Sequence, residues 1–197
     1  LRYMAEHFSP KEFWYNGENL EFPAFRDLMA LLEAKGIRKR TPSELKEGRE
    51  TSGTLIEILH PAGSLLSRRS NDNSLVMRLS SGGRSFLFPG DLEVAGEQQL
   101  IARSGSKLKS DVLLAPHHGS KSSSSSPFLE AVAPEVCIIS SGQGNPFGFP
   151  SHEVLGRLTG QGCRVLRVDE VGAIEVSASG RGLEIRTFRQ GFRGALQ

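Results

Sequence analysis

Apolar and polar positions alternate along the chain in short blocks, which predict a succession of strands and helices. Blocks with period-two alternation or a short apolar run are expected to be strands: 12–17, 54–59, 74–79, 85–88, 111–115, 136–140, 164–168, 173–176 and 183–188. Segments with apolar residues at helical spacing are expected to be helices: Pro23 to Gly36, 97–103, 127–132 and 152–158. Strands outnumber helices but alternate with them in the middle of the chain, which favours a layered α/β fold.

The middle of the chain predicts one continuous sheet. Strands 74–79 and 85–88 are separated by Ser81-Gly82-Gly83, a tight turn that favours antiparallel pairing. Strands 111–115 and 136–140 should continue the same sheet, with the later helices crossing over one outer face. The polar segment 41–52 is expected to be a surface loop. The serine run 122–126 is expected to be a solvated loop and helix cap, with phosphate binding as the alternative.

Composition narrows the class of protein only in part. The 197 residues carry 24 Lys and Arg against 22 Asp and Glu, which leaves a net charge of +2. This length fits one compact domain, and no stretch approaches the roughly 20 apolar residues of a transmembrane helix. Only Arg38-Lys39-Arg40 forms a basic run, so charge does not indicate a partner. Cys137 and Cys163 are expected to be core thiols, with a disulfide as the alternative.

Polar residues that could bind a metal or take part in catalysis follow two of the predicted strands. Asp91 comes after the run Phe86-Leu87-Phe88-Pro89-Gly90, and His117 and His118 follow Leu113-Leu114-Ala115. Ligands gather at the carboxyl ends of strands in open α/β sheets, and a carboxylate beside an imidazole suits zinc, manganese or iron. Adjacent strand residues face opposite ways, so at most one of the two histidines should face a metal.

Each of these signals also has a structural interpretation. An aspartate after glycine is typical of a turn or a helix cap, and a histidine pair is often a surface pair. Ser120 is expected to be a cap, because no GxSxG elbow surrounds it. The sequence contains neither a P-loop nor a GxGxxG motif.

Taken in order, however, the motifs resemble one family. The segments that carry the resemblance are 71–76, 86–91, 111–120 with its Pro116-His117-His118-Gly119-Ser120, 138–142, Asn145, Gly148, Pro150, 168–169 and 172–174. Together they resemble the metallo-β-lactamase-like domain of the ComEC family, the DNA-uptake channel proteins of bacterial competence. The resemblance covers nearly the whole chain and is strongest from Leu55 to Ile174.

The resemblance implies a metallo-β-lactamase-like αββα four-layer sandwich with a two-metal phosphodiesterase site. Such a site holds two divalent ions, zinc or manganese, about 3.5–4 Å apart. DNA is the implied substrate, and the transmembrane channel portion of the full-length protein is the implied partner. The implied location is a soluble domain on the outer, periplasmic or extracellular, side of a bacterial inner membrane. The whole of 1–197 is expected to form one such domain, with 177–197 as its C-terminal strand and tail.

Individual positions carry over from the family motif. Asp91 matches the aspartate that bridges the metals, and His118, with His117 beside it, matches the histidines of the site wall. The resemblance therefore implies Asp91 and His118 as catalytic residues and Asp91, His118 and His117 as metal ligands. The residues expected to line or border the pocket are Asn73, Ser74, Ser120, Phe149 and His152.

Two departures from the family pattern bear on activity. The family's main ligand motif, HxHxDH, precedes the segment that matches 1–14, so the chain is expected to be an incomplete piece of a longer protein that begins after this motif. Family members also read GHPH where this chain has Gly148-Phe149-Pro150-Ser151, which puts Phe149 at a metal-ligand position. His152 is one residue away from the second family histidine and is the candidate substitute.

These observations leave three hypotheses. The chain is the C-terminal part of a metal-dependent nuclease-type hydrolase domain, inactive as a fragment because two credible ligands are fewer than a metal needs. Alternatively, it is a degenerate module with a structural or DNA-contacting role, which Phe149 favours. A related metallo-hydrolase with another substrate is the third hypothesis.

Overall fold

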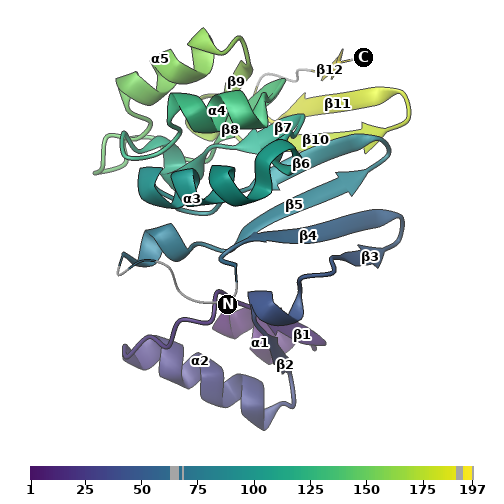
Figure 1. The fold of residues 1–197 in the computed structure, drawn as a ribbon, viewed down its shortest axis with the longest axis vertical. Helices are drawn as coiled ribbons and strands as arrows, with labels where there is room; N and C mark the ends of the chain where they lie inside the picture. Colours follow the sequence, from purple (N-terminus) through teal and green to yellow (C-terminus); the bar gives the residue numbers. More distant parts are fainter. Residues whose placement is uncertain (63–66, 68, 190–192, 197) are drawn as a thin grey trace.

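The main element of the structure, a computed structural model that describes residues 1–62, 67, 69–189 and 193–196, is a seven-stranded mixed sheet (Figure 1). Its strands follow one another in sequence order: β3 (Arg49–Thr51), β4 (Thr54–His60), β5 (Val76–Ser81), β6 (Arg84–Phe88), β7 (Val112–Leu114), β8 (Val136–Ile139) and β9 (Arg164–Arg167). Pairing is antiparallel from β3 to β6 and parallel from β6 to β9. The predicted hairpin and its continuation into the two later strands are therefore confirmed.

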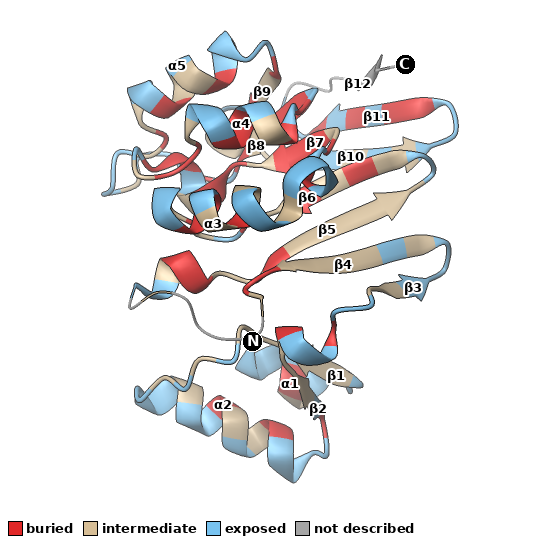
Figure 2. Ribbon diagram, viewed as in Figure 1, coloured by how far each residue is buried: buried red, intermediate tan, exposed pale blue. Residues whose placement is uncertain are grey.

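Three helices cover one face of this sheet (Figures 1 and 2). They are α3 (Val94–Ser104), α4 (Ser126–Val132) and α5 (His152–Gly160). Leu100, Phe128 and Leu158 from these helices are fully buried against Leu87 and Leu113 of the sheet. The crossovers between parallel strands thus place helices on one outer face, as the sequence predicted.

A second, antiparallel sheet packs on the opposite face. It consists of β10 (Ile174–Ser179), β11 (Gly182–Thr187) and β12 (Arg193–Leu196). Leu183 and Ile185 of β11 are buried against Val112, Val136 and Leu166 of the large sheet. Helices, large sheet and second sheet therefore form successive layers, and β7 and β8 read as continuous apolar runs because both of their faces are buried.

The N-terminal segments form a small unit at one edge, shown in purple in Figure 1. It contains α1 (Arg2–His7), β1 (Glu12–Trp14), α2 (Pro23–Ala34) and β2 (Arg38–Arg40). β1 and β2 pair in parallel, and Leu28, Leu32 and Ile37 form a separate core cluster with Ala5. The basic run Arg38-Lys39-Arg40 forms β2, and the Arg40 guanidinium donates to the Glu12 carboxylate.

The predicted surface loop 41–52 is wrong in part. It contains the 3₁₀ turn η1 (Pro42–Glu44) and β3, which pairs antiparallel with β4. Ser52 and Gly53 both have positive φ values, 50° and 75°, as in the two-residue hairpin turns that suit strand twist. The three residues of β3 are all polar, so no alternation of apolar and polar positions marks this strand in the sequence.

The two cysteines are joined rather than free. A disulfide links Cys137 to Cys163, with the Cα atoms 6.1 Å apart, a spacing that disulfides favour. Cys137 lies in β8 and Cys163 directly precedes β9, its parallel neighbour. Core burial was predicted correctly, but the preference for thiols was wrong, because α5 separates the two residues in sequence and only the sheet brings them together.

Remaining connections are short: η2 (Ser70–Asn73), η3 (Gly105–Leu108), η4 (Pro116–Gly119) and α6 (Val168–Val171). Within the described ranges, none of the helices is both long and apolar enough to cross a membrane.

His60, at the end of β4, generates a pH prediction. Its imidazole is fully buried, which lowers its pKa; a hydrogen bond between Nε2 and the Asp72 carbonyl oxygen (2.8 Å) opposes this shift, and the charge of Arg103 adds to it. The unfolded chain therefore binds a proton at this residue more readily than the folded protein does. The stability that neutral His60 permits is fully present above about pH 6.5 and is lost as the pH falls below that value.

We expect the thermal midpoint to fall between pH 7.5 and pH 5.5, and to fall less in His60→Gln, which retains a donor near Nε2 without the titration. Differential scanning calorimetry at both pH values checks this. His7→Gln, an exposed control, should keep the wild-type pH dependence; an equal pH dependence in wild type and His60→Gln would contradict the assignment.

Candidate functional site

The carboxyl ends of β6, β7 and β8 meet at one edge of the large sheet and surround a cleft of about 440 Å³. The described residues that line it are Asp91, His117, His118, Ser140, Ser141, Gly142, Asn145, Phe147 and Phe149. Asp91 follows β6, the histidines lie in η4 after β7, and the others belong to the loop after β8. Parallel pairing therefore gathers the three polar segments, as expected of strand ends.

Asp91 and His118 face each other across this cleft. His118 Nε2 lies 3.7 Å from Asp91 Oδ1, and both side chains are about half exposed, at 53% and 47%. The Asp91 backbone N–H donates to Ser74 Oγ at 3.1 Å. Asp91 is not the cap of α3, because the N-cap residue is Glu93. The predicted proximity of Asp91 and one histidine is present, and their chemical roles stay predictions.

A hydrogen bond at the far side of the ring fixes the tautomer of His118. Its Nδ1 lies 2.7 Å from the Ser140 carbonyl oxygen, and because a carbonyl only accepts, Nδ1 carries the proton. In the neutral ring, Nε2 then carries a lone pair directed toward Asp91. An imidazole that donates one N–H to a carbonyl and presents its other nitrogen to the site is the arrangement of metal-binding histidines.

The turn that presents the histidines has an unusual backbone. His117 and His118 both adopt left-handed φ values, 50° and 55°, which cost energy for residues with a side chain. The His117 N–H donates to the Gly90 carbonyl at 3.0 Å, and the Ser120 N–H donates to the His117 carbonyl at 2.9 Å. The turn is therefore held from both sides, and strained backbone of this kind is concentrated at functional sites.

The two histidines have different neighbours. His117 Nδ1 lies 3.3 Å from Glu93 Oε1 without hydrogen-bond geometry, whereas only His118 faces Asp91. One histidine toward Asp91 was expected from the pleat of a strand. That reason does not hold, because both residues lie in the left-handed turn beyond the strand, and which histidine would face a metal stays a prediction.

Aromatic rings form the other wall of the cleft. Phe149 meets His117 edge-on, with centroids 5.7 Å apart and an angle of 67°. Phe147 stacks on Phe149 at 5.6 Å and 20°, and it is 74% exposed. The Asn145 amide donates to the Gly142 and Phe149 carbonyl oxygens and fixes this loop. Phe149 thus lines the cleft, and its side chain has no metal-binding atom.

The donor set fits only part of a metal site. Among the described ranges, no group of three or more His, Cys, Asp or Glu residues is placed to hold an ion. Asp91 and His118 supply one oxygen and one nitrogen donor, whereas zinc sites in proteins take three or four protein ligands. Further ligands would have to come from outside these residues, so no catalytic step is derived from this set.

Four other predicted residues lie beside the cleft wall rather than in it. Asn73 is buried and its amide donates to Glu18, while Ser74 supports Asp91 from behind. Ser120 is buried and shares a hydrogen bond with Ser122. His152 is exposed at the start of α5. None of these four is among the described residues that line the cleft.

Glu97 is a supporting residue that the sequence did not reveal. Its fully buried carboxylate accepts the backbone N–H groups of Ser124 and Ser125. Burial raises the pKa of Glu97, and the hydrogen bonds and the charge of Arg157 oppose that shift. Arg157 donates to the Ser123 and Ser124 carbonyl oxygens from the other side.

The serine run is therefore not a solvated loop. Ser123 and Ser124 are fully buried, and Ser123 Oγ donates to the Leu92 carbonyl oxygen. The expected helix cap is present, since Ser125 is the N-cap residue of α4, but a solvated loop was wrong for Ser123 and Ser124, because a serine-rich sequence does not show the buried partners that satisfy it. Glu97 and Arg157 anchor this loop directly behind the histidine turn.

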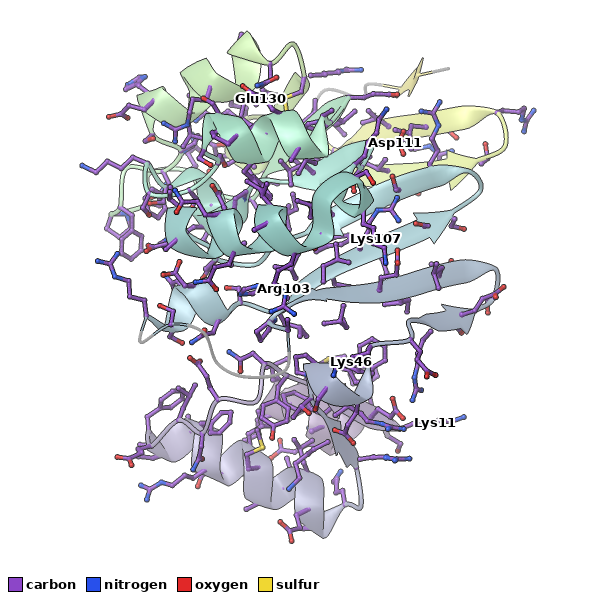
Figure 3. All side chains as sticks on the ribbon, in the orientation of Figure 1. Lys11, Lys46, Arg103, Lys107, Asp111 and Glu130 are labelled. Carbon is purple, nitrogen blue, oxygen red and sulfur yellow. A yellow bond between two sulfur atoms is a disulfide. The ribbon has the colours of Figure 1, made fainter. Side chains whose placement is uncertain are left out.

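Glu97→Ala should lower the free energy of unfolding by about 2–6 kcal/mol, because one buried and one partly buried backbone donor lose their acceptor at about 1–3 kcal/mol each. Urea denaturation measures this. Glu130→Ala, an exposed site on α4 labelled in Figure 3, is the control and should stay within about 0.5 kcal/mol of wild type. A loss below about 1 kcal/mol for Glu97→Ala would contradict the anchoring role.

No family model matches the chain, but several curated proteins are similar to it. The chain is 39% identical over 119 residues to "Competence protein ComA" of Neisseria gonorrhoeae, covering 60% of this chain and 17% of that protein. It is 40% identical over 105 residues to "ComE operon protein 3" of Bacillus subtilis, covering 53% and 13%. It is 38% identical over 140 residues to "Recombination protein 2" of Haemophilus influenzae, covering 71% and 17%.

These matches span less than a fifth of each relative, so they concern one segment of much longer proteins. The chain is therefore homologous to one segment of each of these proteins, one of which is named a competence protein.

Proposed function

We infer that this chain belongs to a metallo-β-lactamase-like domain of a ComEC-type DNA-uptake protein, and that the domain hydrolyses phosphodiester bonds with the help of divalent metal ions. The observation that carries this proposal is the Asp91–His118 pair. A carboxylate oxygen lies 3.7 Å from Nε2 of an imidazole whose Nδ1 hydrogen-bonds to a carbonyl oxygen, at the carboxyl edge of the parallel strands.

The layered fold supports the proposed family. Helices cover one face of the large sheet and a second sheet packs on the other, which corresponds to α, β and β layers of an αββα sandwich. The exposed outer face of β10, with Glu175, Ser177 and Ser179, is the face that a fourth layer would flank. In this proposal residues 1–197 form one domain, and 177–197, expected to be one strand and a tail, contain the end of β10 together with β11 and β12.

Zinc or manganese is the proposed metal, and Asp91 and His118 are the residues that would hold it. A bound divalent ion would supply an activated water and a clamp for phosphate oxygens. The remaining ligands are proposed to come from an HxHxDH motif elsewhere in the full-length protein. His117 sits beside Glu93 and Phe149, where it supports the wall of the cleft.

DNA is the proposed substrate for two reasons. Relatives of the chain are named as competence and recombination proteins. In addition, Phe147 and Phe149 form a stacked pair at the cleft, and the exposed ring of Phe147 offers a surface on which a base can stack. Base–aromatic stacking contributes about 1–3 kcal/mol per base in single-strand binding.

The proposed location is the outer side of a bacterial inner membrane, next to a transmembrane channel portion of the same protein. The Cys137–Cys163 disulfide supports an oxidising compartment, since such bonds persist in the periplasm and outside cells.

A degenerate module that contacts DNA without cleaving it is the second candidate. Phe149 favours it, because this residue occupies the position at which the resemblance implies a metal-binding histidine and its ring fills that part of the cleft wall.

A DNA-cleavage assay with manganese or zinc separates the two candidates. The full-length protein should cleave single-stranded or duplex DNA, and Asp91→Ala and His118→Ala should each reduce the rate at least 100-fold, while the exposed control His7→Ala should change it less than twofold. The 197-residue chain alone should not cleave, because two ligands do not hold a catalytic metal.

Phe149→His in the full-length protein should raise the rate by restoring a ligand. A full-length protein that binds DNA but shows no metal-dependent cleavage would establish the degenerate module. Cleavage by the 197-residue chain that Asp91→Ala abolishes would show that the ligand set is wrong.

A further inference from the structure

A second cavity, of about 390 Å³, lies away from the Asp91 cleft and shares no residue with it. It opens between the segment after η1, the end of β4, and the junction of α3 with η3. The described residues that line it are Pro42, Lys46, Ile58, Leu59, Pro61, Ala62, Arg103, Ser104 and Lys107. Its volume falls in the range of small-ligand sites in proteins.

Three residues with positively charged side chains line this cavity, and they come from three different segments of the chain. Lys46 lies two residues after η1, Arg103 lies in the last turn of α3, and Lys107 lies in η3; all three are labelled in Figure 3. All three side chains belong to exposed residues. The described lining contains no Asp or Glu, so the cavity has an uncompensated charge of +3.

Several arginines elsewhere in the described chain are neutralised by acidic side chains. Arg40, Arg84 and Arg167 each form ion pairs with acidic side chains at 3.2 Å or less. Within the described part of the chain, Lys46, Arg103 and Lys107 form neither an ion pair nor a side-chain hydrogen bond with another residue.

The rest of the wall is apolar. Pro42 and Pro61 are buried, and Ile58, Leu59 and Ala62 are partly exposed to the cavity. The register of β4 against β5 shifts between Ile58 and His60, and such bulges bend a strand away from its partner. A flat or aliphatic body can therefore lie on this wall while an anionic group contacts the three cations.

We propose that this cavity binds a nucleoside phosphate, either free or as one unit of a single-stranded nucleic acid. The phosphate contacts Arg103, Lys46 and Lys107, and the base lies against the proline and aliphatic wall. Guanidinium groups match phosphate geometry with paired donors, and lysines act as point charges beside them. Converging cations without a carboxylate repel one another, and a bound phosphate relieves that repulsion.

The test measures binding of a fluorescein-labelled oligothymidine and of thymidine 5′-monophosphate to the 197-residue chain, by anisotropy and calorimetry. The variant Arg103→Gln/Lys107→Gln removes two cavity charges. Lys11→Gln/Arg181→Gln is the matched control, because it removes one exposed lysine and one exposed arginine outside the cavity lining. Thermal midpoints of both variants are compared to confirm equal folding.

Arg103→Gln/Lys107→Gln should weaken oligothymidine binding at least tenfold at 50 mM salt, and the control should weaken it less than threefold. The slope of log K against log salt should become shallower by about 1.4, since each single-strand phosphate contact contributes about 0.7. If the wild-type chain binds thymidine 5′-monophosphate and the variant does not, the cavity accepts free nucleotides as well. If the wild-type chain binds only oligothymidine, the cavity accepts a nucleotide as part of a strand.

Equal weakening in both variants would overturn the proposal, because it would show general charge attraction. So would binding only to phosphatidylglycerol vesicles with no response to either nucleotide ligand. The cavity shares no lining residue with the Asp91 cleft, so full-length protein that cleaves DNA while Arg103→Gln/Lys107→Gln binds oligothymidine as tightly as wild type would overturn this site alone and leave the proposed nuclease function standing.

Discussion

Parallel pairing of β6, β7 and β8 is the constraint on which the rest of the structure depends. It makes three strands end at one edge, so Asp91, the histidine turn and the loop after β8 meet there although they are far apart in sequence. The strands can be this apolar because helices bury one face and the second sheet buries the other. Because both faces of these strands are buried, the polar groups lie at the edge where the strands end.

At this edge, contacts between elements hold residues in conformations and environments that are locally unfavourable. Two successive left-handed residues turn His118 so that Nδ1 reaches the Ser140 carbonyl and Nε2 faces Asp91. Behind this turn, Glu97 and Arg157 hold the buried serine run by its backbone groups. The cost of strain and of a buried charge is offset by hydrogen bonds from neighbouring elements, which keep the side chains in place before any ligand binds.

Much of the sheet could be predicted from sequence because its signals are local. The runs at β6, β7 and β8 and the glycine turn before β6 identify strands and their order, and Asp91 and His118 follow as residues at strand ends. The disulfide, β3 and the role of Glu97 could not be predicted, since each depends on a partner that only the folded chain brings near. The same holds for the cations at the second cavity, which are scattered in sequence and gather in space.

The central claim is that Asp91 and His118 together contact a metal ion. A zinc titration of the 197-residue chain, followed by the imidazole NMR signals of His118 and His7, tests it most directly. The account predicts a weak, saturable shift at His118 Nε2, none at His7, and at least a tenfold loss of affinity in Asp91→Ala. A His118 signal that ignores zinc, or that responds equally in Asp91→Ala, would contradict it.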